Sequence, residues 1–450
     1  MLRTSLSALV LSLSLAAVST AHAAPDGFLD PLFGQGGLQK VAFGEGADMS
    51  AARGIAVLPD GRILLTGFVQ RENNTTEIGL ARLRADGQVD ESFGRPRYLP
   101  AGLESVYVSA AALQPDGKLV VVGEADLIGP GKRALVCRFL ANGSVDTGFA
   151  TIDNALAPGC RVVEDANDST AAAVVIQRSG RIALAGSIYY NNVLHGLVVR
   201  LDASGNYDGD FAESGVGILL PASTHDTELV DIAETPAGDL VAVGSALVNS
   251  DASWQVFRLR GADGAPDTDF DGDGLRPIDI DQVAGGNDYA YVTSVLPDGR
   301  IVIGGLARGS QGYCPAVARL KPDGAFDNSL DGDGLYVDPF CALAFDGISD
   351  MVVQSDGRMV LAGDGDGDFF AMRFAPEGGR DVDFGQGGLI YFNFASLTGM
   401  DGMDMSYRVA NHGGRLLLAG YTLSIADDIP HADFAAARLD NDLIFADGVE

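Results

Sequence analysis

The feature that most constrains this chain is a unit of roughly 60 residues that recurs seven times along it. One turn glycine marks each unit and returns after 56 to 63 residues, at Gly61, Gly117, Gly180, Gly238, Gly299, Gly357 and Gly414. A second glycine always follows six residues later, at Gly67, Gly123, Gly186, Gly244, Gly305, Gly363 and Gly420. Repetition at a nearly constant period indicates that each copy forms the same small supersecondary structure.

The first copy shows what one unit forms. Residues 55–58 are an apolar run that ends at a Pro-Asp-Gly turn, residues 62–66 are rich in leucine, and residues 80–83 precede an Ala-Asp-Gly turn. A fourth, weaker apolar run is clearest at residues 38–43, 217–220 and 389–392. Short apolar runs divided by turn residues predict four antiparallel strands in each unit.

A sheet of four such strands is apolar on both faces and cannot bury both faces alone. Stacking the sheets in a ring covers these faces and limits exposed edges. We therefore predict an all-β fold, a seven-bladed β-propeller of four-stranded antiparallel blades. A solenoid is the alternative, although solenoid repeats usually have only ~20–50 residues.

The two ends of the chain complement each other. Residues 26–43 match the end of a unit, and the last unit stops soon after its third strand, near Asp440. We expect this N-terminal strand to complete blade 7 and to close the ring. One domain, residues 24–450, would then follow a leader of residues 1–23.

The repeat resembles the bacterial delta-60 repeat family. The shared pattern is an apolar strand, Pro-Asp-Gly with Arg or Lys, an apolar strand ending in Gly, then Ala-Arg-Leu, Asp-Gly, Asp and Phe-Gly, as in residues 54–67 and 81–94. It extends over essentially the whole chain after the leader. The resemblance implies a secreted, propeller-like protein, and it supplies no catalytic residues.

Residues 1–23 have the pattern of a signal peptide. Arg3 gives the positive start, residues 6–18 are apolar, and Ala21-His22-Ala23 is a small-residue cleavage signal. The apolar run is too short for a membrane span. We therefore expect a periplasmic or extracellular protein.

The charge of the chain narrows the choice of partner. The formal net charge is −31 at pH 7, with 61 acidic and 30 basic residues. This balance argues against nucleic acid or an anionic membrane surface as the partner. A protein or glycan ligand and a monomeric state are what we expect.

The four cysteines, Cys137, Cys160, Cys314 and Cys341, predict disulfide bonds in an exported protein. Cys137 and Cys314 lie in the third strands of their units, and the other two lie in the connections that follow. Because the two pairs occupy similar places, 137–160 with 314–341 is the favoured one of the three pairings.

An arginine recurs in the third strand of every unit, at Arg82, Arg138, Arg200, Arg258, Arg319, Arg373 and Arg438. An aspartate follows eight residues later in most units, and nine residues after Arg258. Asp30 could supply the carboxylate for Arg438, which has none at this spacing. A structural ion pair in each blade is the interpretation we favour over a catalytic one, because an active site does not need seven copies.

Acidic loops suggest calcium as the one candidate cofactor. One acidic loop contains Asp267, Asp269, Asp271 and Asp273, and a second loop has fewer acidic residues at similar places, Asp327, Asp331 and Asp333. These spacings occur in calcium loops and resemble the loops of integrin-type propeller repeats. The twelfth loop position is Ile278, where a calcium loop would have glutamate. The first loop is also a variant of the ordinary repeat, which is a structural explanation for it.

Nearly every unit carries an acidic or amide residue 10–13 positions before its turn glycine. These candidates are Asp48, Glu104, Asn167, Asp168, Asp226, Asn287, Asp288, Asp346, Asp401 and Asp404. Each precedes the first strand of a unit, so we expect them at the mouth of a central channel, on the same side as the variable loops. There they would bind a cation or a cationic or polyhydroxylated ligand, or form only a solvated acidic rim.

No arrangement of residues predicts catalysis, because the histidines lie in different units and have no nucleophile at a shared spacing. The function we favour is a secreted, non-catalytic binding module that acts through its variable-loop face. One alternative is a hydrolase or lyase that uses carboxylates on an extracellular polymer; it requires carboxylates from different blades to converge in one pocket. A structural envelope protein is the other alternative.

Overall fold

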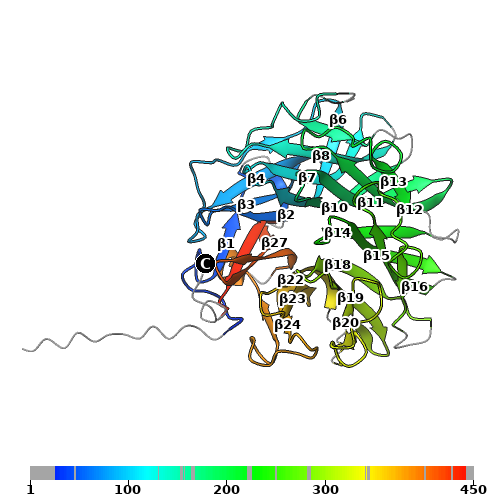
Figure 1. The fold of residues 1–450 in the computed structure, drawn as a ribbon. Helices are drawn as coiled ribbons and strands as arrows, with labels where there is room; N and C mark the ends of the chain where they lie inside the picture. Colours follow the sequence, from blue (N-terminus) through cyan, green and yellow to red (C-terminus); the bar gives the residue numbers. More distant parts are fainter. Residues whose placement is uncertain are drawn as a thin grey trace, which may run out of the picture.

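The computed structural model describes residues 26–441 except 45–46, 130, 153–155, 157, 164–167, 220–225, 249–250, 281–284, 340, 342–344, 400–401 and 427–428. The leader assigned to residues 1–23 lies outside these residues. Regular structure in the described part is almost entirely β-strand, with one short helix there, α1 (Ala395–Thr398). The sheets are arranged around a central axis, with β10, β14, β18 and β22 closest to it (Figure 1).

Five sheets have four antiparallel strands each, hydrogen-bonded in sequence order. The first sheet contains β6 (Leu103–Leu113), β7 (Leu119–Leu127), β8 (Lys132–Phe139) and β9 (Cys160–Val162), and the second contains β10 (Ser169–Ile176), β11 (Ile182–Tyr190), β12 (Val193–Leu201) and β13 (Val216–Leu219). The third contains β14 (Thr227–Glu234), β15 (Leu240–Val248), β16 (Asp251–Leu259) and β17 (Leu275–Ile278), and the fourth contains β18 (Tyr289–Val295), β19 (Ile301–Gly309), β20 (Gly312–Leu320) and β21 (Leu335–Val337). The fifth contains β22 (Phe345–Val353), β23 (Met359–Gly365), β24 (Asp368–Phe374) and β25 (Leu389–Phe392).

A sixth sheet has eight strands and contains both ends of the described chain. Its order is β26 (Asp404–His412), β27 (Arg415–Ala426), β28 (Ile429–Leu439), β2 (Ala47–Val57), β3 (Ile63–Arg71), β4 (Thr76–Leu83) and β5 (Arg97–Tyr98), and β1 (Leu38–Val41) also pairs with β28.

The prediction of seven blades is wrong, because the structure has five four-stranded blades. The strands of the first and last repeat units do not form separate sheets. They are joined where β2 pairs in parallel with β28, at Met49 and Ala432. Strand β1 pairs antiparallel with β28 over its whole length, from Leu38 opposite Ala437 to Val41 opposite Phe434.

The alternating strand directions sort the connections onto two faces. The turns from first to second strand are short and nearly constant in length, and they share one face with the connections from third to fourth strand, here called the constant-turn face. The third-to-fourth connections have 13 to 15 residues, except the one of 20 residues between β8 and β9. The connections from second to third strand, and from each unit to the next, share the opposite face, here called the variable-loop face. Residues 220–225, between β13 and β14, lie outside the described part of the chain.

The hydrophobic core lies in layers between neighbouring sheets. Val120 and Val122 of β7 pack in one cluster with Ile182 and Leu184 of β11. Trp254, which is fully buried, packs in another cluster formed from β15, β16 and the sheet that follows. Alternate residues of each second strand therefore face opposite neighbours, which explains why these strands are apolar throughout.

The innermost strand of every repeat has a β-bulge. In each one the register with the second strand shifts by one residue, at Arg53, Ser109, Ala172, Val230, Tyr291, Ser349 and Tyr407. A bulge breaks the alternation of side chains, so neighbouring residues can turn towards the same side of the strand. Here that side is the central axis.

The second glycine of the repeat makes room for this bulge. A Cβ atom at Gly123 would lie 1.9 Å from the carbonyl oxygen of Tyr107, and one at Gly186 would lie 2.0 Å from that of Thr170. Both carbonyls belong to the innermost strand just before its bulge. The glycine that recurs six residues after each turn glycine therefore allows a close approach of two backbones.

The two predicted disulfide bonds are confirmed. Cys137 is bonded to Cys160 and Cys314 to Cys341. The sequence analysis placed Cys160 in a connecting loop. In the structure it begins β9, where it pairs in register with Cys137. That disulfide therefore fixes the short outer strand of its blade.

Candidate binding site in the central channel

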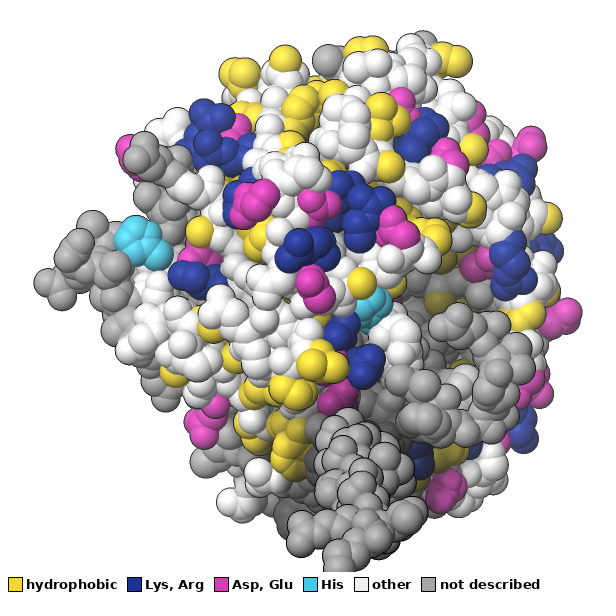
Figure 2. All heavy atoms as spheres, turned by 90° about the vertical axis from the view of Figure 1, so that its left-hand side faces the viewer, with side chains coloured by type: hydrophobic (Ala, Val, Ile, Leu, Met, Phe, Trp, Pro, Cys, Tyr) yellow, Lys and Arg dark blue, Asp and Glu magenta, His cyan; other side chains and the backbone are white. Residues whose placement is uncertain are grey.

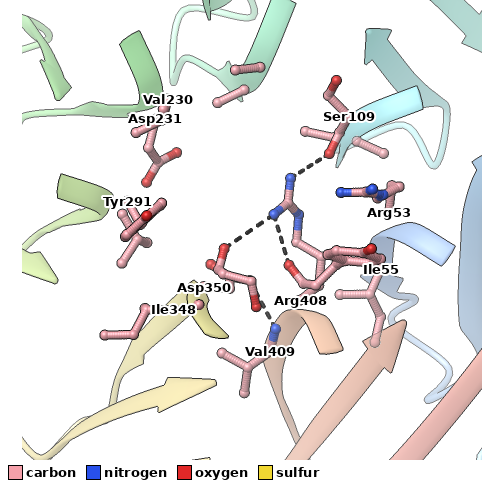
Figure 3. A pocket seen from close by; sticks show the side chains of 18 of the residues that line it. Arg53, Ile55, Ser109, Val230, Asp231, Tyr291, Ile348, Asp350, Arg408 and Val409 are labelled. Atoms are coloured by element: carbon pink, nitrogen blue, oxygen red, sulfur yellow. Dashed lines mark hydrogen bonds between the residues drawn. The ribbon is translucent and has the colours of Figure 1, made fainter. Parts of the chain in front are cut away.

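The innermost strands enclose a cavity of about 520 Å³ at the centre of the ring (Figure 3). All seven bulge residues line it, together with most of the residues that directly follow them. The volume falls within the ~300–1,000 Å³ typical of small-molecule sites. Small residues such as Ala172 and Ala173 form one part of the wall, and charged and aromatic side chains form the rest.

Three carboxylates line this cavity. One is the buried Asp364 on β23. The other two, Asp231 on β14 and Asp350 on β22, are half-buried and come from different blades. Each accepts hydrogen bonds from two backbone N–H groups. Asp231 accepts from Ile232 (2.9 Å) and from Thr293 of the next blade (2.7 Å). Asp350 accepts from Met351 and from Val409 of β26, both at 2.9 Å.

Burial dominates the titration of Asp231 and Asp350. The pKa of Asp231 is raised to about 7, mainly by loss of solvent and to a smaller extent by repulsion from the Asp350 carboxylate. The hydrogen bond from Thr293 and the charge of Arg408 oppose this shift. Burial also raises the pKa of Asp350, against the charge of Arg408. The Asp231 carboxyl therefore changes its charge near neutral pH, unlike an ordinary aspartate.

Two arginines line the same cavity. The Nη2 of Arg408 donates to the carbonyl oxygen of Ser109 (2.6 Å), and its Nη1 donates to those of Tyr407 (2.8 Å) and Ser349 (3.5 Å). The guanidinium carbon of Arg53 lies 3.4 Å from the ring centre of Tyr407. Within the described residues, neither arginine forms an ion pair.

Tyrosines form a third part of the wall. The ring of Tyr291 lies 6.4 Å from that of Tyr289, which in turn lies 6.0 Å from that of Tyr313. Burial raises the pKa of Tyr291 to about 12, so its phenol keeps its proton and can donate a hydrogen bond at neutral pH. Burial also raises the pKa of Tyr407.

The described residues of the predicted channel-mouth set do not line this cavity. They are Glu104, Asp168, Asp226, Asn287, Asp288 and Asp404. Asn167 and Asp401 lie outside the described residues, and of Asp48 and Asp346 only the backbone is described.

Several of these residues connect one repeat unit to the unit before it. Oδ1 of Asp168 accepts from the backbone N–H of Lys132, Oδ1 of Asp226 from that of Leu194, and Oδ1 of Asn287 from that of Ala252, each at 2.9 Å. Asp288 and Asp404, each 1 % exposed, also accept backbone hydrogen bonds, from Ile280 (3.0 Å) and Phe394 (2.7 Å). A ligand-binding role for this set stays a prediction.

The predicted calcium residues of each loop hydrogen-bond or pair with different partners. Asp267 forms an ion pair with Arg258 (2.9 Å), and Asp271 forms one with Arg276 (2.9 Å). Asp269 donates its backbone N–H to Asp267 (3.2 Å). Within the described ranges, no three His, Cys, Asp or Glu residues form a group that could hold a metal ion.

The second acidic loop is arranged in the same way. Asp327 forms ion pairs with Arg319 (2.8 Å) and Arg300 (3.0 Å), Asp333 accepts the backbone N–H of Leu335 (2.9 Å), and Asp331 adopts a positive φ of 47° in the same turn. Calcium binding stays a prediction for an experiment.

The seven recurring arginines each form an ion pair with an aspartate of their own turn or, for Arg438, with Asp30. Their partners are Asp90, Asp146, Asp208, Asp267, Asp327, Asp381 and Asp30. Most of them also donate to a backbone carbonyl in the following repeat, as Arg438 does to Ala85 (2.7 Å). Arg200 is 1 % exposed and stacks on Phe211, with 4.4 Å from its guanidinium carbon to the ring centre.

The charged residues of the cavity escaped the sequence analysis, although their positions carry a signal. Asp231 and Asp350 stand seven residues before the turn glycines Gly238 and Gly357. Arg408 stands six residues before the last one, because that turn is one residue shorter. The equivalent residues of the other units are Gly54, Ala110, Ala173 and Val292. A charge at a position otherwise small or apolar is the signal that could have found them.

Outside the cavity, charges of both signs are mixed. Figure 2 shows acidic and basic side chains interspersed on one side of the ring. Many of them form exposed pairs within one turn, such as Arg62 with Asp60 and Arg84 with Asp86. Such exposed pairs contribute little to stability.

Four segments of the chain match a known family model, described as a domain of unknown function (DUF5122) β-propeller: residues 58–93, 114–149, 177–211 and 296–330. Each segment runs from the end of an innermost strand to the residue that closes the turn after the third strand. The chain is a β-propeller repeat protein. No curated protein sequence matches the propeller.

Solved structures with a similar fold include the polysaccharide lyase Uly1, at a TM-score of 0.51 and 11% identity over 96% of both chains. A polysaccharide lyase named PL25 ulvan lyase matches at 0.45 and 10%, over 88% of this chain and 95% of the other. A protein of unknown function from Dyadobacter fermentans matches at 0.41 and 13%, over 90% and 100%. At 11% identity the first likeness concerns the fold alone, and the lower TM-scores add nothing to it.

The two disulfides are consistent with an extracellular location. In the described part of the chain, none of the helical structure has the length and apolar character needed to span a membrane.

Proposed function

We propose that this protein is a secreted binding module of the delta-60 repeat type, and that its central cavity binds a small polyhydroxylated ligand such as one sugar residue of a glycan. The observation that carries the proposal is the cavity itself. Its lining gathers three carboxylates, two guanidinium groups and two tyrosines around about 520 Å³.

The chemistry of the wall suits a sugar. Asp231 and Asp350 can accept hydrogen bonds from hydroxyl groups, and Arg53 and Arg408 can donate to hydroxyl oxygens. The rings of Tyr291 and Tyr407 offer flat, partly apolar surfaces beside these polar groups. A few converging polar groups in a largely preformed cavity are typical of small-molecule sites.

A purely structural role explains these residues less well. Elsewhere in the ring, arginines and aspartates form close ion pairs, whereas among the described residues the cavity arginines form none and interact with the cavity carboxylates only at longer range. Placing charges where other repeats have Ala, Gly or Val costs stability unless they serve another purpose. Carboxylates with strongly shifted pKa values are also concentrated at functional sites.

A panel of immobilised glycans and free sugars, followed by calorimetry on each hit, tests the proposal. We expect at least one sugar to bind the wild-type protein, and we expect Tyr291→Ala and Asp350→Asn to weaken it about tenfold or more. Arg84→Gln, which changes an exposed turn residue, is the matched control and should bind normally. The proposal fails if both cavity variants bind every hit as tightly as the control does.

Acid–base chemistry on a polysaccharide is a second candidate, favoured by the raised pKa of Asp231 beside a second carboxylate. A lyase or hydrolase needs a group that exchanges a proton near the working pH. Incubation with neutral and acidic polysaccharides, followed by measurement of new chain ends, tests this candidate. Product formation that Asp231→Asn abolishes would establish this enzymatic function. Binding of a polymer without cleavage would contradict it and support the binding module instead.

A further inference from the structure

We infer that the cavity selects a sugar with a single acidic group, and that Arg53 and Arg408 receive that group. This inference rests on the proposed function and adds the class of ligand. Arg53 projects from β2, and Asp231 projects from β14 on the opposite side of the cavity (Figure 3). A third carboxylate of the lining, Asp364 on β23, acts electrostatically on Arg53.

Arg53 is not held as the structural arginines are. Within the described residues it forms no ion pair, and its Nε atom is buried without a hydrogen-bond partner. Its guanidinium group instead lies against the ring of Tyr407, 3.4 Å from the ring centre, and 6.0 Å from that of Phe68. A guanidinium group stacked in this way keeps its N–H donors in one plane, ready for an acceptor.

Arg408 lies between Arg53 and the acidic side. Three backbone carbonyls fix its Nη atoms, so its side chain is already ordered before any ligand arrives. These carbonyls accept hydrogen bonds and do not neutralise the positive charge. The charge of Arg408 acts on both Asp231 and Asp350. The charge of Asp364 on β23 acts on Arg53. Arg53 nevertheless keeps a buried Nε donor without a hydrogen-bond partner, so it is the cavity arginine with a donor left for an anion.

A carboxylate, sulfate or phosphate group on a sugar would supply that anion. Arginine binds such groups through two parallel N–H···O bonds, which are short and directional. The ring hydroxyls of the same sugar would then point across the cavity towards Asp231 and Asp350. Since the whole protein carries a net charge of −31, long polyanions are repelled from it. One acidic sugar residue therefore fits the site better than a dense run of charges.

Calorimetry with the complete protein tests this inference in two steps. The first compares glucose with glucuronate, glucose 6-sulfate and glucose 6-phosphate, which share the ring and differ in the acidic group. We expect at least one acidic sugar to bind about tenfold more tightly than glucose. Which of the three binds best identifies the acid. If glucose binds as tightly as all three, the inference is overturned and the proposed function remains.

The second step tests Arg53. In Arg53→Gln we expect the affinity for the acidic sugar to fall about tenfold more than the affinity for glucose, and Arg53→Lys should restore part of the difference. Arg84→Gln is again the control. Equal loss of both ligands would overturn the role of Arg53. No binding of any sugar would overturn the proposed function as well. The first step uses the wild type alone, so it decides the question even if a variant does not fold.

Discussion

At the scale of single residues, the same two side-chain types play opposite parts in this molecule. In the turns, arginine and aspartate neutralise each other, as Arg200 and Asp208 do at 2.8 Å. In the central cavity, Arg53 and Asp231 lie on opposite sides, and Arg408 lies between Arg53 and the acidic residues (Figure 3). The first arrangement stabilises the repeat, and we propose that the second serves a ligand.

Replacing Arg200 with alanine should lower stability and leave ligand binding unchanged. Arg200 is buried, bonded to Asp208 and stacked on Phe211. Its removal leaves a buried carboxylate whose remaining cationic partner among the described residues is the half-exposed Arg181. We expect a loss of about 3 kcal/mol in the free energy of unfolding, measured by denaturant titration. Arg84→Ala removes an exposed arginine and should cost less than about 0.5 kcal/mol. Equal stability of the two variants would contradict a buried pair.

The pH dependence of stability should change in Asp231→Asn. The pKa of Asp231 rises from 3.8 in the unfolded chain to about 7 in the folded one. The folded state therefore holds the proton more tightly, so the contribution of this group is full below pH ~4 and is lost as the pH rises through 7. We expect the wild type to lose about 2 kcal/mol more than the variant between pH 5 and pH 8.

Denaturant titrations at the two pH values measure this difference. Asp86→Asn, an exposed change in a turn, serves as the control and should follow the wild type. If the free energy of unfolding changes between the two pH values by the same amount in Asp231→Asn and in the wild type, the Asp231 carboxyl is well solvated.

At the scale of the strand, one device recurs throughout the ring. A bulge in each innermost strand brings adjacent residues to the cavity. A glycine on the second strand, which has no Cβ atom, leaves space for the carbonyl group that the bulge displaces. The framework is thus the same in every repeat, while the side chains at the bulge differ. Variation at these positions changes the lining of the cavity without changing the backbone.

A Cβ atom on that glycine should disturb the framework. In Gly186→Ala the new atom would stand 2.0 Å from the carbonyl oxygen of Thr170, so the two strands must move apart. We expect a loss of about 3 kcal/mol in thermal or denaturant unfolding. Gly209→Ala is the matched control, since Gly209 is exposed and has nothing within 4 Å of the added atom. If the two substitutions cost the same, the close approach is not a constraint.

The sequence was sufficient to predict the features that repeat. Strand order within a unit, the arginine–aspartate pairs and both disulfides follow from spacings that recur or match, such as those of Cys137 and Cys314. The bulges were not predicted, because a register shift leaves no trace in the apolar pattern of one strand. Asp231, Asp350 and Arg408 were missed for the same reason, since their meeting at the axis depends on that shift.

At the scale of the whole molecule, the number of sheets could not be predicted from the repeats. The count of units suggested separate blades, but a single parallel pairing between Met49 and Ala432 joins the strands of the first unit to those of the last unit in one sheet. Such a contact depends on how the ring comes together in space. It has no counterpart within any one repeat.

Deleting residues 24–43 should destabilise the whole ring. The deletion removes β1 from the edge of β28, the buried Phe33, and Asp30, which pairs with Arg438 at 2.7 Å. We expect the melting temperature to fall by about 5 °C or more, as calorimetry would record. Removal of residues 442–450 is a control of another chain end. A deletion of residues 24–43 with an unchanged melting curve would show that β1 contributes little.

The pairing of β1 with β28 also governs the order of events when the protein is made. Strand β1 ends at Val41, and its partner begins at Ile429, roughly 390 residues later. At a synthesis rate of ~5–20 residues per second, the interval between them is about 20–80 s. During this time the first strand to emerge has no partner, and Asp30 carries a charge without its arginine. The eight-stranded sheet is therefore the last to form, and the ring can be completed only after β28 has been synthesised.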